Sequence, residues 1–307
     1  MRWKTGILTV GIVGVAALLA AMGTSYVADR YAGERQLTGP PATPELIARG
    51  AYLAQLGDCA ACHSIPGKPP YSGGLGMVTP IGAIYTTNIT PDPTYGIGGF
   101  SLADFDRALR FGVAEGHTLY PAMPFTSYYN TTPEDVAALY AYFQHGVPAA
   151  AVSNRPSDIP FPLSMRWPLT YWRWFFAPKP APFKPLAADA EIARGAYFVE
   201  GLGHCGECHT PRGFLGQMEL SRALAGAPLP DGHGKAANLR GGDFLNWTDA
   251  DIVEALTSGF TPGGDVLGAG MTAVVRNLAE LPESDRQAIA VYLKSLPPLG
   301  PPAPAKP

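Results

Sequence analysis

The chain has 307 residues, of which 47% are hydrophobic and only 15% charged, and its formal net charge is −3. This length suggests about two domains, and the apolar fraction is ample for a core in each. The slightly acidic balance argues against nucleic acid as a partner, because a phosphate-binding protein needs a basic face.

The first expected element is an apolar helix at the N-terminus. Arg2 and Lys4 precede an apolar stretch from residue 6 to residue 27, which would rise about 33 Å as a helix, enough to cross a bilayer. We predict that residues 1–28 are an uncleaved anchor; a signal peptide cleaved near Ala21-Met22-Gly23 is the alternative. Positive charge before the helix keeps the N-terminus cytoplasmic and the rest of the chain outside.

A linker over residues 29–44 leads into an internal repeat. The hexapeptide IARGAY occurs at residues 47–52 and again at residues 192–197, an offset of 192 − 47 = 145. Because later matches hold this register with small drifts, we predict two homologous helical domains, at residues 45–150 and 188–298.

Further matches fix three helices in each domain. FSLADF at residues 100–105 pairs with WTDADI at residues 247–252, and Asn88 pairs with Asn238. TPED at residues 132–135 and PESD at residues 282–285 each precede apolar residues at i, i+3 and i+4 spacing, as in an amphipathic helix. The fold class is therefore predicted to be all-α.

Two pentapeptides carry the chemistry: Cys59-Ala-Ala-Cys62-His63 and Cys205-Gly-Glu-Cys208-His209. C-x-x-C-H is the c-type haem attachment signature, in which both thiols add to haem vinyl groups and the histidine binds the iron. We predict two covalently bound haem c groups, which would use all four cysteines. A four-thiolate zinc site and a redox C-x-x-C pair are the alternatives, and neither needs the histidine.

Methionine is the usual sixth ligand of an electron-transfer haem. Met123 lies 123 − 63 = 60 residues after the first histidine and Met271 lies 271 − 209 = 62 residues after the second, so these two are predicted as axial ligands with His63 and His209. Met77 and Met218 are the rivals.

Other residues are expected to support the haems. Each axial histidine should donate its second ring N–H to a backbone carbonyl, with residues 64–66 and 210–211 as the nearest suppliers. Hydrogen bonds to the haem propionates are expected from Asn88, Tyr85 and Trp247. Gly50 and Gly195, inside helices, are explained by close approach of Tyr142 and Tyr292 or by simple tolerance near a helix end.

The segment between the domains, residues 151–187, holds three of the five tryptophans. It is too aromatic for a free linker, and we expect a strap packed between the domains; a surface for a partner or a membrane is the alternative. The Pro-rich tail, residues 299–307, is expected to be extended.

Read together, these motifs resemble the membrane-anchored cytochrome c subunits of bacterial periplasmic dehydrogenases that oxidise alcohols, gluconate or aldehydes. The resemblance covers residues 45–298 and is carried by residues 85–92, 96–99, 119–125, 194–197, 200–205 and 208–213. It implies an N-terminal transmembrane helix followed by two tandem cytochrome c domains, on the periplasmic side of the bacterial inner membrane. The typical subunit has three haem motifs, whereas this chain has two.

The resemblance also implies a role and partners. Such a subunit is no enzyme by itself. It takes electrons from a catalytic dehydrogenase subunit with a quinone, flavin or molybdenum cofactor, and passes them to ubiquinone or a terminal oxidase. An anchored cytochrome serving an oxidase complex is one alternative. A dihaem peroxidase is another, although two methionine-ligated irons would leave it no open site; thiosulfate oxidation would need a spare cysteine as ligand.

Overall fold

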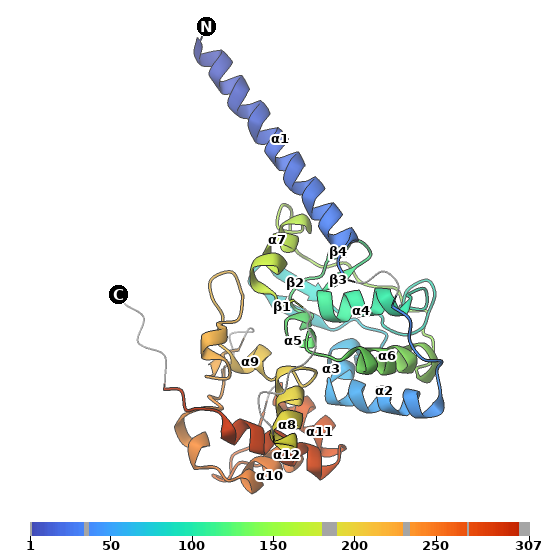
Figure 1. Cartoon of the computed structure of the whole chain (residues 1–307). Coiled ribbons are helices and arrows are strands. Elements are labelled where there is room, and N and C mark those ends of the chain that lie inside the picture. Colours follow the sequence, from blue (N-terminus) through green and yellow to red (C-terminus); the bar gives the residue numbers. More distant parts are fainter. Residues whose placement is uncertain (1, 34–36, 180–188, 230–233, 269, 301–307) are drawn as a thin grey trace.

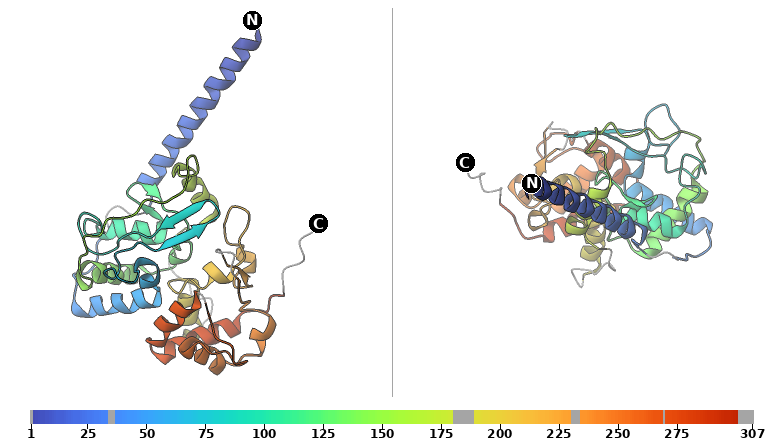
Figure 2. Two further views of the ribbon diagram at one scale, coloured as in Figure 1. Left: turned by 180° about the vertical axis from the view of Figure 1, so that it is seen from behind. Right: turned by 90° about the horizontal axis from the view of Figure 1, so that it is seen from above.

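The computed structural model describes residues 2–33, 37–179, 189–229, 234–268 and 270–300. One long helix, α1 (Arg2–Arg30), projects from a globular body made of the rest of the chain. The views in Figure 2 show the same projection from behind and from above. Parts of the expected linker, strap and tail lie outside the described residues.

The residues before the strap are mainly helical, with two short antiparallel ladders. In β1 and β2, Gly76 pairs with Tyr85. The elements are α2 (Pro44–Leu56), α3 (Cys59–His63), β1 (Gly76–Thr79), β2 (Gly82–Tyr85), α4 (Leu102–Phe111), β3 (Val113–Ala114), β4 (His117–Thr118), α5 (Phe125–Tyr128), α6 (Pro133–Ala141) and η1 (Tyr142–Gly146).

The strap and the residues after it add further helices and a third ladder. The elements are α7 (Trp167–Phe176), α8 (Ala190–Glu200), α9 (Gly206–His209), η2 (Leu220–Arg222), β5 (Ala227–Pro228), β6 (Lys235–Ala236), η3 (Gly242–Asn246), α10 (Asp249–Ser258), α11 (Met271–Ala279) and α12 (Glu283–Ser295). The all-α expectation is right for the helices, but it omitted these three two-stranded ladders.

Side-chain caps begin α4, α6 and α10, and the start of α6 at residues 132–135 is the one predicted from the sequence. Ser101 caps α4 and Thr248 caps α10, each in a capping box with the aspartate three residues later. Thr132 caps α6 by accepting from the backbone N–H of Asp135. The repeat therefore places the middle and closing helices in both halves of the chain.

Each half is built around one close helix crossing. A Cβ atom on Gly50 of α2 would lie 2.0 Å from the carbonyl oxygen of Ala138 in α6. In the second half, a Cβ on Gly195 of α8 would lie 1.9 Å from the carbonyl oxygen of Ala288 in α12. The same Cβ positions are 2.6 Å from the Cβ atoms of Tyr142 and Tyr292, so the expected close approach is confirmed.

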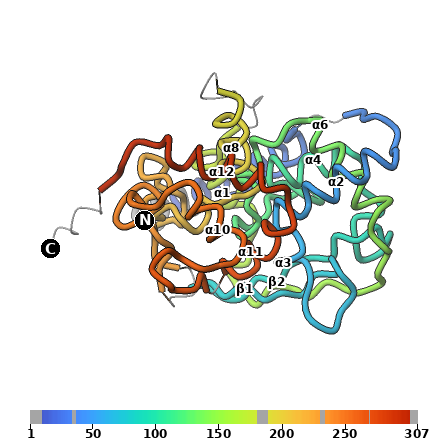
Figure 3. The backbone as a smooth tube through the Cα atoms, turned by 90° about the horizontal axis from the view of Figure 1, so that it is seen from below, coloured from blue at the N-terminus to red at the C-terminus, as the bar shows by residue number. Residues whose placement is uncertain are grey.

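The buried residues of both halves form one contiguous hydrophobic cluster, from Leu53 in α2 to Leu293 in α12. Seen from below, the first half with α2, α4 and α6 lies beside the second with α8, α10 and α12 (Figure 3). Their division into two tandem cytochrome c domains stays a prediction.

The strap lies against α1 rather than only between the halves. Its helix α7 packs against the end of α1 and against β4 (Figure 1). Trp172 of α7 contacts the Phe125 ring in the first half and donates to the carbonyl of Leu215 in the second, at 2.8 Å. Through this one side chain α7 contacts both halves, which fits the expected strap in part.

Candidate functional site: the two C-x-x-C-H segments

Both C-x-x-C-H runs fold as a single helical turn, α3 and α9, in which the two cysteines are three residues apart and share a face. The residue before each first cysteine has a left-handed backbone: Asp58 has φ 51° and His204 has φ 41°. None of the four cysteines forms a disulfide. The repeat therefore extends to the backbone of the attachment segments.

The two histidines are oriented by backbone carbonyls, as expected. His63 Nδ1 lies 2.7 Å from the carbonyl oxygen of Thr87, and His209 Nδ1 lies 2.7 Å from that of Ala237. An Nδ1–H donor at these distances leaves Nε2 as the nitrogen for a metal. Burial lowers the pKa of both rings, which favours the neutral form that ligation requires.

The carbonyls come from a different place than the sequence suggested. Thr87 and Ala237 are far from the segments directly after the histidines, and each stands just before the repeated asparagine, Asn88 or Asn238. This pairing of repeated asparagines was the signal that could have located them.

Asn88 is a structural residue. Its side-chain amide donates to the carbonyls of Ala150 and Val152, and its oxygen accepts from the N–H and hydroxyl of Thr90. Asn238 likewise donates to the carbonyl of Leu299 at 3.0 Å. Both amide hydrogens of Asn88 are used by these carbonyls, and its expected hydrogen bond to a propionate stays a prediction. Tyr85 donates to Asp158 at 2.7 Å instead.

The two predicted distal methionines differ in their surroundings. Met123 is partly buried against the hydrophobic cluster that Cys59 also contacts, and its N–H donates to the Tyr120 carbonyl. Met271 is the first residue of α11, and the later α11 residues Val274 and Leu278 line a cavity of about 20 Å³ together with Cys205. Ligation of the irons by these two sulfurs stays a prediction.

The rival methionines have other surroundings. Met218 Sδ would lie 3.9 Å from a Cβ on Gly206, so it packs against the second attachment turn itself. Met77 sits in β1, opposite Ile84. Met218 is partly buried, and its role as a packing residue rather than an iron ligand stays a prediction.

The two attachment segments meet where the halves join. Glu207, inside the second C-x-x-C-H run, accepts hydrogen bonds from Thr126 at 2.7 Å and Ser127 at 2.8 Å, both in α5. Tyr128 of α5 donates to the carbonyl of Gly57, two residues before Cys59, and its ring lies 5.7 Å from that of His204. Helix α5 begins two residues after Met123, so it joins the predicted distal loop of one half to the attachment turn of the other.

The donor arrangement fits haem better than the alternatives. Burial raises the pKa of the Cys59 and Cys205 thiols to about 12, so neither is a reactive thiolate of the kind that a redox C-x-x-C pair uses. Within the described residues, no three His, Cys, Asp or Glu side chains converge as a zinc ion would need. The two cysteines on one face could each bind a haem vinyl group, and the histidine could bind the iron through Nε2. This arrangement fits covalent haem.

Comparison with known proteins points the same way. No protein-family model matches the chain. It is 51% identical over 272 residues to the gluconate 2-dehydrogenase cytochrome c subunit of Pantoea cypripedii, covering 85% of this chain and 62% of that protein. It is 47% identical over 280 residues to the cytochrome c subunit of the quinone-type alcohol dehydrogenase of Gluconacetobacter polyoxogenes, covering 88% of this chain and 60% of that one.

A third relative matches over nearly its whole length. The chain is 41% identical over 298 residues to a dihaem c-type cytochrome of Cereibacter sphaeroides, covering 95% of this chain and 97% of the relative. By contrast, the chain spans about six tenths of the length of the gluconate and alcohol dehydrogenase subunits.

Proposed function

We propose, from the premise that this chain belongs to the family of dehydrogenase cytochrome c subunits, that it is a dihaem c-type electron-transfer protein without catalysis of its own. The repeated attachment turn carries the proposal. Each copy combines two cysteines on one face with a histidine whose Nδ1 is held by a carbonyl. The length match to a dihaem cytochrome supports a count of two haems.

The residues that would hold the haems follow from these turns. Cys59 and Cys62 would bind the first haem covalently and Cys205 and Cys208 the second, with His63 and His209 as proximal and Met123 and Met271 as distal ligands. Bound haem supplies a one-electron redox centre. The protein's part is to fix each histidine ring through Thr87 or Ala237 and to hold both attachment turns together through α5.

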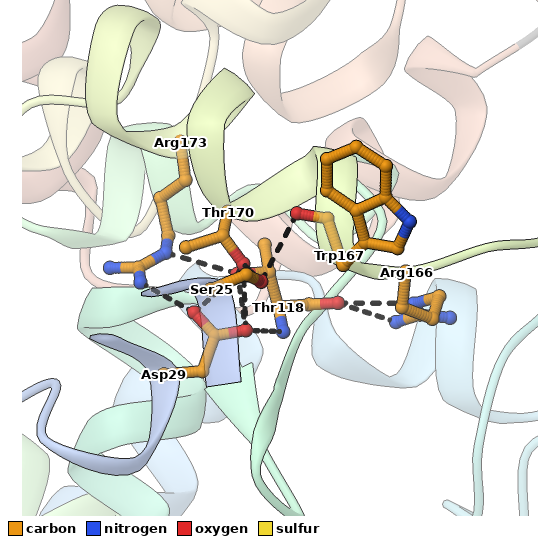
Figure 4. Close-up of polar contacts among 7 residues, drawn as sticks. All are labelled: Ser25, Asp29, Thr118, Arg166, Trp167, Thr170 and Arg173. Atoms are coloured by element: carbon orange, nitrogen blue, oxygen red, sulfur yellow. Dashed lines mark hydrogen bonds and ion pairs between the residues drawn. The ribbon is translucent and has the colours of Figure 1, made fainter. Parts of the chain in front are cut away.

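The proposed location is the bacterial inner membrane. Helix α1 is long and apolar enough to cross a bilayer, by length and composition, and its positively charged start favours a cytoplasmic N-terminus. Its last turns are part of the globular body, since Ser25 and Asp29 are buried against β4 and α7 (Figure 4). This packing supports a retained anchor over a cleaved signal peptide. With a cytoplasmic N-terminus, the haem domains would lie on the periplasmic side.

The proposed electron donor is a catalytic dehydrogenase subunit that carries a quinone, flavin or molybdenum cofactor. The relatives named as gluconate and alcohol dehydrogenase subunits support this choice. The proposed acceptor is ubiquinone or a terminal oxidase.

A second candidate is a dihaem cytochrome that serves an oxidase complex. The Cereibacter sphaeroides relative is named as a dihaem c-type cytochrome without a stated partner, so it supports the haem count of both candidates alike. Both functions use the same chemistry and differ in partners.

The partners decide between the two candidates. The chain is extracted from native membranes in mild detergent, co-purifying subunits are identified, and alcohols, aldehydes and sugar acids are added while haem absorbance is followed. We expect a cofactor-bearing dehydrogenase and substrate-driven haem reduction. Co-purification with oxidase subunits and no reduction by any substrate would favour the oxidase-linked cytochrome.

A further inference from the structure

The side of the body from which α1 emerges carries exposed apolar side chains. They come from α7 and from the turn before it, and we call them the membrane-side patch: Phe161, Leu163, Met165, Trp174 and Phe175. Phe161 is 81% exposed and Phe175 is 77% exposed, which is unusual for side chains of this size. Figure 1 shows α7 beside the end of α1.

One face of α7 is already occupied by α1 and β4. Thr170 is fully buried and donates to Asp29 at 2.9 Å, and its oxygen lies 2.7 Å from that of Ser25. Arg173 forms a buried ion pair with Asp29 at 2.9 Å (Figure 4). The position of α7 relative to α1 is therefore fixed by charged and polar contacts, and Trp174 and Phe175 lie on the part of its surface left exposed.

The height of α7 along α1 can be compared with the thickness of a bilayer. The Tyr171 hydroxyl donates to the carbonyl of Ala21 at 2.9 Å, and Arg173 reaches Asp29, so α7 lies beside residues 21–29. A hydrocarbon core about 30 Å thick needs about 20 helical residues. Counted from Lys4, the last charge before the apolar stretch, such a span ends near Thr24. Helix α7 therefore lies at the expected boundary.

The aromatic residues of α1 agree with this boundary. Tyr26 and Tyr31 are exposed near its end, and Trp3 precedes Tyr26 by 26 − 3 = 23 residues, a rise of about 34 Å. Tryptophan and tyrosine are enriched at both membrane interfaces. The exposed Trp174 of α7 joins Tyr26 and Tyr31 at the same end of α1.

We propose that α7 and the preceding turn lie in the interfacial layer of the membrane, with the membrane-side patch against the lipid. The proposal rests on the proposed anchoring by α1 and adds a second membrane contact to it. The position of α7 beside residues 21–29, where the expected span ends, favours lipid over a protein partner. Together α1 and α7 would hold the haem-bearing body in one orientation on the bilayer.

The test uses introduced thiols in the full chain with its haems attached. Phe175→Cys probes the patch, and Leu18→Cys probes α1. Phe260→Cys is the matched control, because Phe260 is an exposed phenylalanine just after α10. Helix α10 lies at the end of the body opposite α1 (Figure 1). Single chains are placed in nanodiscs of phosphatidylethanolamine and phosphatidylglycerol, and alkylation by a charged, water-soluble maleimide is timed. All three positions are exposed, so the variants should fold.

We expect Phe175→Cys and Leu18→Cys to be alkylated at least about tenfold more slowly than Phe260→Cys, because thiols in lipid are shielded from a charged reagent. Slow alkylation at Leu18 with control-like alkylation at Phe175 would overturn the inference and leave the anchor intact. If Phe175 were then shielded only in the native complex, the patch would be a protein-docking surface.

Fast alkylation at Leu18 would refute both the anchor and the membrane contact. Alkylation of the chain without an introduced cysteine would instead contradict the proposed haem attachment, because its four cysteines should all be in thioether bonds.

Discussion

The Tyr52 hydroxyl lies 2.6 Å from a carboxylate oxygen of Asp285, a residue 233 positions further along the chain. The equivalent contact runs from the second half to the first: the Tyr197 hydroxyl donates to Asp135 at 2.7 Å. Both tyrosines end the repeated hexapeptide IARGAY. The arginine of the same hexapeptide, Arg49 or Arg194, pairs with the aspartate of its own half. Each buried aspartate therefore binds the arginine of one copy and the tyrosine of the other.

The reciprocal contacts predict that Tyr52→Phe and Tyr197→Phe each destabilise the protein. Each removes a hydrogen bond to a buried carboxylate, which costs about 1–3 kcal/mol. The carboxylates keep their arginines, so the haems should stay attached. Thermal unfolding of the haem-loaded protein measures the loss, and Tyr95→Phe, at an exposed tyrosine, is the control. If the unmodified chain and the three variants unfolded at the same temperature, the two tyrosine–aspartate hydrogen bonds between the halves would have no role in stability.

The glycines at the helix crossings predict a different kind of defect. Alanine at Gly50 or Gly195 would gain about 1 kcal/mol in helix propensity, but its Cβ would overlap a backbone carbonyl of the partner helix. The helices must move apart, and we expect a net loss of about 3 kcal/mol or more. Denaturant unfolding measures it. Gly99→Ala has open space around its Cβ position and should be close to neutral. A stabilised Gly50→Ala variant would refute the close crossing.

The ion pair at the end of α1 should matter more than an exposed one. Asp29 and Arg173 side chains are 3% and 11% exposed, whereas Asp158 and Arg155 are 53% and 59% exposed. Arg173→Met leaves a buried carboxylate without its cation and should cost about 3 kcal/mol, whereas Arg155→Met should cost about 1 kcal/mol or less. Denaturant unfolding in detergent compares the two. Similar losses would mean that Asp29 is better hydrated than the structure shows.

The distal methionines are tested by an external ligand. Met123→Ala and Met271→Ala should each keep both haems attached but open one iron to carbon monoxide, because the thioether that closes the sixth position is gone. Carbon monoxide difference spectra of the reduced protein measure this. Met77→Ala and Met218→Ala are the controls and should behave as the unmodified chain. Carbon monoxide binding by a control variant, with none in its partner, would reassign that ligand.

Local sequence signals predicted the parts of the site that depend on short spacing. The C-x-x-C-H runs and the helix start at residues 132–135 depend on residues close together in the chain, where local backbone geometry decides the structure. The glycines inside helices also marked the crossings correctly, because a glycine weakens a helix and is useful there when another backbone needs the space of its Cβ.

Long-range contacts were harder to predict. The carbonyls of Thr87 and Ala237 reach the histidines through loops whose path depends on Asn88 and Asn238 bonding to still later residues. The hydrogen bond between Tyr52 and Asp285 depends on how the two halves pack, and so does the hydrogen bond between Glu207 and α5. A single sequence shows which residues repeat, but not which copy each will contact.

The intact mass of the chain purified from its native membrane tests the central claim most directly. The account predicts the mass of the full polypeptide plus two haem groups, and the loss of one haem when Cys59 and Cys62, or Cys205 and Cys208, are replaced by alanine. A full-length chain with free thiols, or with a single haem, would contradict the assignment of two covalent haem sites.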